Sequence, residues 1–129
     1  MKKALRLSSL AIVLMALLTL TACAPKDAPA AKQKLEDKGY TVVADGTIIP
    51  AALKLVKVEG VETVLVATKK GENDQVESVT MILFKEKAQA KDSFEAVKDY
   101  AAKQAEKTSV KQAGKWLYYG TEQGMKDFA

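Results

Sequence analysis

The start of the chain divides into a basic segment, an apolar run and a short polar end. Lys2, Lys3 and Arg6 precede the apolar run, which is unbroken from Leu10 to Leu18. This run is shorter than the roughly 20 residues that a membrane-spanning helix needs. A basic start followed by a short apolar core is typical of a secretion signal that is removed after export. The pattern therefore predicts a cleaved signal peptide over residues 1–22.

Beyond the signal, the pattern changes to short amphipathic and β-branched segments. Residues 31–38 are predicted to form a short helix, which Gly39 is placed to end because glycine adopts the left-handed conformation cheaply. The β-branched, aromatic run at residues 40–44 predicts a strand. Pro50 interrupts residues 47–59, so the pattern there fits either a turn of helix or a loose strand.

The middle of the chain predicts a β-hairpin. Residues 61–69 and 76–84 are rich in β-branched and apolar side chains, and a polar turn separates them. The second segment first alternates polar and apolar residues and then becomes apolar at every position, as in a central strand.

The last third of the chain predicts a long helix, two short strands and a final helix. Residues 86–106 carry one apolar stripe at helical spacing: Ala90, Phe94, Val97, Ala101 and Ala105. Residues 110–112 and 115–119 are predicted strands, and Thr121 is placed to cap the final helix. Hairpins with separated helices predict an α+β fold, namely an antiparallel sheet of about five strands with helices packed on one face.

The signal ends in Leu20-Thr21-Ala22-Cys23, and this segment resembles the lipobox of bacterial lipoproteins. The resemblance implies that signal peptidase II recognises the residues before Cys23 and cleaves after Ala22. It also implies a diacylglyceryl group on the Cys23 sulfur and a second acylation, such as palmitate, on the freed amino group. Two acyl chains anchor a protein stably, since each buried methylene contributes about 0.8 kcal/mol. An ordinary secretion signal with a chance cysteine and an uncleaved membrane helix are the alternatives.

The expected organisation downstream is a short tether and one exported domain. Residues 23–31 contain small residues, two prolines and one charge of each sign, which predict a flexible tether after the lipidated Cys23. Residues 32–129 are long enough for a single domain. Ala24 is not the aspartate that retains many lipoproteins at the inner membrane. We therefore expect the domain on the outer face of the cytoplasmic membrane, or on the outer membrane of a Gram-negative cell.

Two short motifs resemble the small lipoproteins of low-GC Gram-positive bacteria. The first is Lys38-Gly39-Tyr40 after a short helix, and the second is the ending Gly-x-Trp-x-Tyr-x-Gly-Thr over residues 114–121. The resemblance implies an envelope lipoprotein and carries over no activity and no site residue.

Composition narrows the function classes. Loss of the signal removes three of the 20 basic residues and none of the 16 acids, so the formal charge falls from +4 to about +1. Because Arg6 is the only arginine and belongs to the signal, a nucleic-acid partner is not expected. The chain has no histidine, which is the commonest general base and metal ligand, and its one cysteine allows no internal disulfide.

The only candidate contact group in the domain is aromatic. Trp116 and Tyr118 share one face of a predicted strand, and Tyr119 lies on the other. An exposed pair could stack on a sugar ring or a partner protein, whereas burial in the core is the usual fate of aromatic side chains in strands.

We expect no catalytic residue, no metal ligand and no cofactor beyond the lipid on Cys23. The expected partners are the membrane, the lipoprotein-processing enzymes and an unidentified envelope protein or ligand. The sequence thus favours a non-catalytic binding or accessory module of the cell envelope. A structural or surface-coat component without a discrete ligand is the alternative, and an envelope hydrolase is a minor one.

Overall fold

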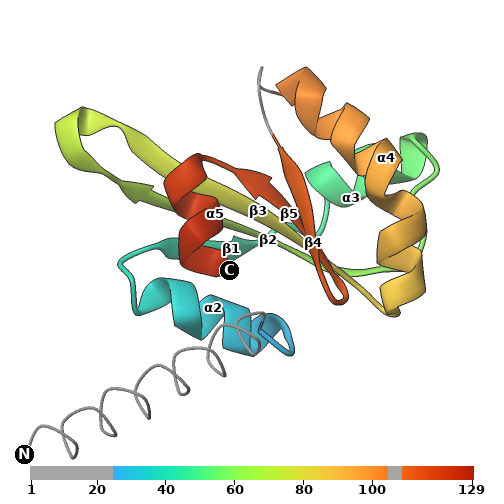
Figure 1. The fold of residues 1–129 in the computed structure, drawn as a ribbon, viewed down its shortest axis with the longest axis horizontal. Helices are drawn as coiled ribbons and strands as arrows, with labels where there is room; N and C mark the ends of the chain where they lie inside the picture. The colour runs from blue at the N-terminus through green and yellow to red at the C-terminus, as the bar shows by residue number, and fades with distance from the viewer. Residues whose placement is uncertain (1–24, 105–108) are drawn as a thin grey trace, which may run out of the picture.

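The computed structural model describes residues 25–104 and 109–129, so the predicted signal peptide and the lipobox, Leu20 to Cys23, lie outside the described residues. The described chain contains one five-stranded sheet and four α-helices (Figure 1). In chain order these are α2 (Ala28–Glu36), β1 (Thr41–Ala44), α3 (Ile48–Leu55), β2 (Val61–Lys70), β3 (Val76–Phe84), α4 (Lys87–Gln104), β4 (Val110–Ala113), β5 (Trp116–Gly120) and α5 (Glu122–Phe128), with a short 3-10 turn (Glu72–Asp74) between β2 and β3. The predicted α+β class is confirmed.

All neighbouring strands in the sheet are antiparallel, in the order β1-β2-β3-β5-β4. The predicted hairpin is confirmed, because β2 and β3 pair from Val61 opposite Phe84 to Lys70 opposite Val76. β3 is the central strand, and its last residues, 81–84, are all buried.

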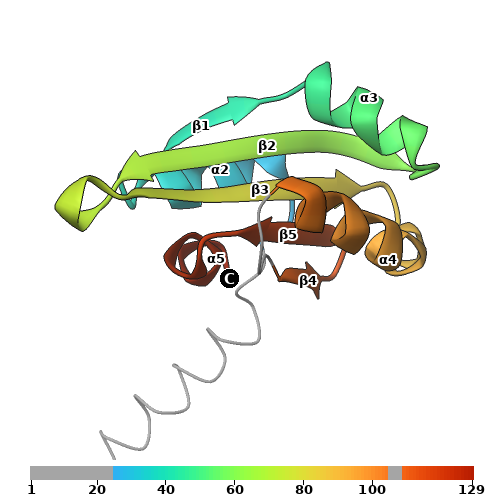
Figure 2. The same cartoon turned by 90° about the horizontal axis from the view of Figure 1, so that it is seen from above.

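The helices cover both faces of the sheet, so the expectation of helices on one face is wrong. One core lies under α2 and α5 and includes Met81 and Trp116. The other lies under α3 and α4 and includes Ile82 and Leu117. Figure 2 shows α3 and α4 in front of the sheet and α2 behind it. The reason is that β3 and β5 carry apolar side chains at consecutive positions, which point to opposite faces, and both faces must then be covered.

The ambiguous segment at residues 47–59 contains helix α3. The Asp45 carboxylate accepts hydrogen bonds from the N–H groups of residues 47, 48 and 49 at 2.9–3.1 Å and so satisfies the start of the helix. Pro50 does not break this helix, because it lies in the first turn, where no N–H is needed for the internal ladder.

Helix α2 begins earlier than the sequence predicts. The Asp27 side chain caps it by accepting a hydrogen bond from Ala30 N–H at 2.9 Å. Ala31 is fully buried, so the flexible tether predicted for residues 23–31 is too long. The helix ends at Glu36, two residues before the predicted end, and the turn after it closes at Gly39 as expected, with a φ of +92° and a hydrogen bond from Tyr40 N–H to the Leu35 carbonyl at 3.0 Å.

Candidate functional sites

The candidate lipid site, Cys23, lies two residues before Pro25, the first described residue. The Trp116 indole N–H donates a hydrogen bond to the Pro25 carbonyl oxygen at 2.7 Å, and the Trp116 side chain is buried. The chain is therefore attached to the domain at Pro25.

The three aromatic candidates are core residues and not a surface contact group. Trp116, Tyr118 and Tyr119 are 1%, 5% and 7% exposed. Trp116 and Tyr118 pack on Phe128 of α5, with ring centroids 5.3 and 4.7 Å apart. Burial raises the pKa of Tyr119, on the opposite face, to about 12. The hypothesis of an exposed stacking pair is therefore corrected, and the aromatic group instead holds α5 and the start of the domain together.

A groove of about 820 Å³ lies between α3, the loop after it and the start of β2. Its apolar lining includes Pro50, Val58 and Val61. Charged residues of both signs also line it. Lys54 lies in α3 and Lys57 just after it, whereas Glu59 lies in the loop before β2 and Glu62 in β2 itself. This combination of an apolar floor with charges of both signs is suited to a ligand that has both apolar and charged parts.

Lys57 in this groove has an unusual backbone conformation. Its φ is +64°, in the left-handed region that glycine normally occupies at a helix end. The hydrogen bonds around it are those of such an end, with Lys57 N–H to the Lys54 carbonyl at 3.0 Å and Val58 N–H to the Leu53 carbonyl at 2.9 Å. This conformation costs a residue with a Cβ about 1 kcal/mol relative to glycine.

The outer side of α3 also exposes large apolar side chains. Ile48 and Leu55 are 76% and 85% exposed, and they are spaced seven residues apart, so they lie on the same side of the helix. The sequence alone did not indicate this site, because residues 47–59 fitted either a turn of helix or a loose strand. The unbroken IIPAAL run was the available signal, since it has more apolar residues than one buried face can use.

A separate polar cluster joins α5 to the opposite end of the sheet. The Tyr40 hydroxyl donates to the Asp127 carboxylate at 2.6 Å, and Lys38 and Lys69 lie 3.9 and 3.6 Å from it. Partial burial opposes ionisation of Asp127, but these contacts and a hydrogen bond from Gln123 outweigh it and lower its pKa. Burial, aided by the bond to Asp127, raises the pKa of Tyr40 well above its usual range. All these partners stabilise the charged form of Asp127, so the role of the cluster is to stabilise the fold.

The described residues, 25–104 and 109–129, also bear on a metal site and on a membrane-spanning helix. There, no three carboxylate, histidine or cysteine side chains come together as a metal site. In the same residues, no helix has the length and apolar character needed to cross a membrane.

No protein-family model matches the chain, and no curated protein and no solved structure matches it either. A functional proposal for this chain therefore depends on its own residues and their geometry.

Proposed function

We propose that this chain is a bacterial lipoprotein, anchored to the cell envelope by lipid on Cys23. The observation that carries the proposal is the segment Leu20-Thr21-Ala22-Cys23 directly after a basic start and a short apolar run. The spacing supports it, since only Ala24 separates Cys23 from Pro25, which a hydrogen bond from Trp116 attaches to the domain.

The exported domain is a non-catalytic binding module, and its ligand site is the groove beside α3. Three features of the groove support this assignment: its volume of about 820 Å³, its mixed apolar and charged lining, and the left-handed Lys57. The ligand it suits is a small molecule or peptide segment that carries an apolar part and charges of both signs. The absence of histidine from the whole sequence supports a binding role over a catalytic one.

The anchor is tested by Cys23→Ser in the native host. The variant should leave the membrane fraction or accumulate as uncleaved precursor, because serine offers no thiol for the diacylglyceryl group. Ala24→Ser is the matched control, and it should be processed and retained. An unmodified Cys23 thiol on the purified membrane form, or a membrane form that still begins at Met1, contradicts the anchor.

The groove is tested by photo-crosslinking in intact cells. A photoreactive residue in place of Lys54, in the groove, should give one or a few discrete adducts. The same residue in place of Lys103, on the exposed side of α4, is the matched control and should give none. Equal, diffuse labelling at both positions would contradict a ligand site and favour a surface coat without a discrete ligand.

A further inference from the structure

Four lysines surround the point where the chain enters the domain. Lys26 follows Pro25, and Lys115 precedes Trp116. Lys85 lies in the connection from β3 to α4, and Lys87 is the first residue of α4. All four are exposed. We call this group, Lys26, Lys85, Lys87 and Lys115, the anchor-end lysines.

Hydrogen bonds join the segments that carry these lysines into one surface. Phe84 N–H donates to the Lys115 carbonyl at 2.8 Å, which connects the end of β3 to the β4–β5 turn. The Gln112 side-chain amide donates to the carbonyls of Lys87 and Gly114 at 3.4 and 3.1 Å. The Trp116 bond to Pro25 then adds the start of the chain. Figure 1 shows the beginning of α2 close to the β4–β5 turn.

The lysines at this end of the sheet have no ion-pair partner among the described residues, whereas lysines at the other end do. Within the described residues, the four ion pairs all lie toward the opposite end of the sheet: Lys38 and Lys69 with Asp127, Lys70 with Asp74, and Lys126 with Glu122. None of them includes an anchor-end lysine.

The acids near the anchor end do not offset these lysines. Asp27, which caps α2, and Glu86 supply two negative charges beside the four positive ones, so an excess of positive charge remains. The loop after α3 reaches this end through Lys85 N–H, which donates to the Gly60 carbonyl at 2.9 Å, and it adds one charge of each sign, Lys57 and Glu59.

We propose that the anchor-end lysines dock the domain on anionic lipid headgroups. The proposal rests on the lipid anchor at Cys23 described above. Two residues of chain, which span at most about 7 Å, join Cys23 to Pro25, so lipid on Cys23 brings this end of the sheet toward the headgroup level. Unpaired lysines at that level are attracted by anionic lipids, and a basic patch is a second membrane signal beside the acyl chains. The acidic β2–β3 turn then points away from the membrane.

Lysine labelling of the lipidated protein tests the docking. The mature protein is reconstituted into vesicles of phosphatidylglycerol and phosphatidylcholine, or of phosphatidylcholine alone, and treated briefly with an amine-reactive reagent. Mass spectrometry then gives a rate for each lysine. The anchor-end lysines should react about fivefold more slowly on the anionic vesicles, and 0.5 M salt should remove the difference. Lys70 and Lys126, at the opposite end, are internal controls whose rates should not change.

The outcomes separate the docking from the anchor. If the N-terminal peptide carries lipid but the anchor-end lysines react equally on both vesicles, the docking is wrong and the anchor stands. If that peptide carries an unmodified Cys23 and the protein stays off the vesicles, both proposals are wrong.

A charge-reversal pair gives an independent measurement. In the native protein, amide hydrogen exchange at the β4–β5 turn should be slower on anionic vesicles than on phosphatidylcholine. Changing Lys26, Lys85, Lys87 and Lys115 to Glu should remove this slowing. The matched control changes four exposed lysines elsewhere to Glu, namely Lys91, Lys98, Lys103 and Lys126, and should retain it. The proposal is overturned if exchange at the β4–β5 turn is still slowed in the variant without the anchor-end lysines, or if the control variant loses the slowing equally.

Discussion

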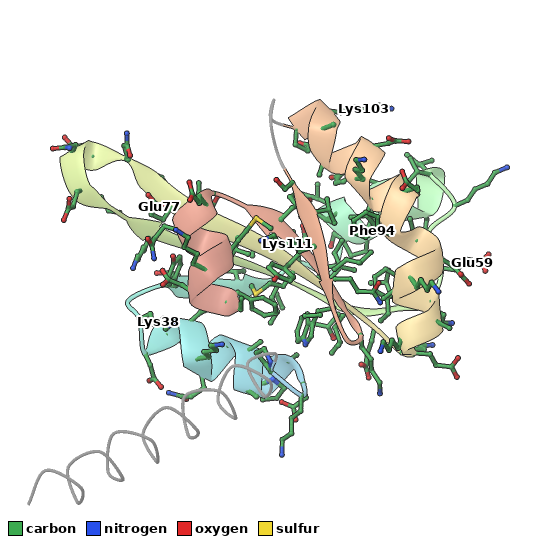
Figure 3. The ribbon with its side chains drawn as sticks, viewed as in Figure 1. Lys38, Glu59, Glu77, Phe94, Lys103 and Lys111 are labelled. Carbon is green, nitrogen blue, oxygen red and sulfur yellow. The ribbon has the colours of Figure 1, made fainter. Side chains whose placement is uncertain are left out.

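On one face of the sheet, α2 and α5 pack against each other and hold both ends of the described chain, whereas on the other face α3 packs mainly on β2. The first face has an aromatic cluster around Phe128 and the polar contacts of Asp127. The second has an open groove, exposed apolar side chains on α3 and a left-handed lysine. Figure 3 shows the side chains of both layers, with Lys38 on the first face and Phe94 on the second. Both faces have a buried core, and the difference indicates that the second face also retains surface for binding.

The largest expected difference between the faces is in the cost of removing an apolar side chain. Phe128→Ala should lower the free energy of unfolding by about 3–5 kcal/mol, because Phe128 is fully buried against Trp116 and Tyr118. Leu55→Ala, on the exposed side of α3, should change it by less than about 0.5 kcal/mol. Urea denaturation of both variants measures the free energy of unfolding. A comparable loss in the two variants would contradict the proposed difference between the two faces.

The next difference concerns how closely the backbone is packed. A Cβ on Gly120 would overlap the Ser78 carbonyl oxygen and lie 2.7 Å from Val79 Cα, both in the backbone of β3. Gly120→Ala should therefore destabilise the protein by about 1–3 kcal/mol. A Cβ on Gly46, before α3, meets nothing within 4 Å, so Gly46→Ala is a near-neutral control. Thermal unfolding should separate the two variants, and an undisturbed Gly120→Ala would show that β5 and β3 can move apart easily.

Sequence reasoning found the elements whose signals are local. The 61–84 hairpin, the glycine stop at Gly39 and the Thr121 cap each depend on a few neighbouring residues, and the structure contains all three. Thr121 Oγ1 accepts from Gly124 N–H at 3.2 Å, as a capping threonine should.

The features that sequence reasoning missed depend on tertiary structure. Helix α3 is stabilised by the Asp45 cap and by burial of Leu53, and its start at Ile48 places Pro50 in the first turn, where proline is tolerated. The groove and the left-handed Lys57 require knowledge of how α3 approaches β2. The burial of Trp116 against Pro25 joins residues 91 positions apart, so no local pattern predicts it.

The Asp127 cluster makes the first face sensitive to acid. Contacts in the folded state lower the pKa of Asp127 below its unfolded value near 4, so its contribution to stability is present above that value and is lost as the pH falls through the folded pKa. Asp127→Asn should cost about 1–2 kcal/mol at pH 7 and reduce the loss of stability on acidification. Asp45, whose pKa is lowered mainly by its hydrogen bond from Thr47 N–H, bonds backbone N–H groups that an asparagine side chain can still cap, so Asp45→Asn should leave the free energy of unfolding nearly unchanged. Denaturation curves from pH 7 to pH 2 check both expectations. If the two variants lost the same free energy of unfolding, the Asp127 contacts would not stabilise α5 more than a helix cap does.

The smallest expected effect comes from two helix ends that share one hydrogen-bond pattern and differ in one residue. Tyr40 N–H returns to Leu35 at the end of α2 with Gly39 in the left-handed position, and Val58 N–H returns to Leu53 at the end of α3 with Lys57 there. Because the left-handed conformation costs a residue with a Cβ about 1 kcal/mol relative to glycine, Gly39→Ala should destabilise the protein by that amount and Lys57→Gly should stabilise it by a similar amount.

The second of these changes also tests what the strain is for. If the Lys57 ammonium contacts a ligand, Lys57→Gly should produce a more stable protein that loses the crosslinked adducts formed from position 54. Lys57→Ala is the matched control, because it removes the ammonium but keeps the backbone strain, so it should lose the adducts without the gain in stability. A glycine variant that is more stable and still forms the adducts would mean that the lysine is tolerated at the end of α3 and is not retained for binding.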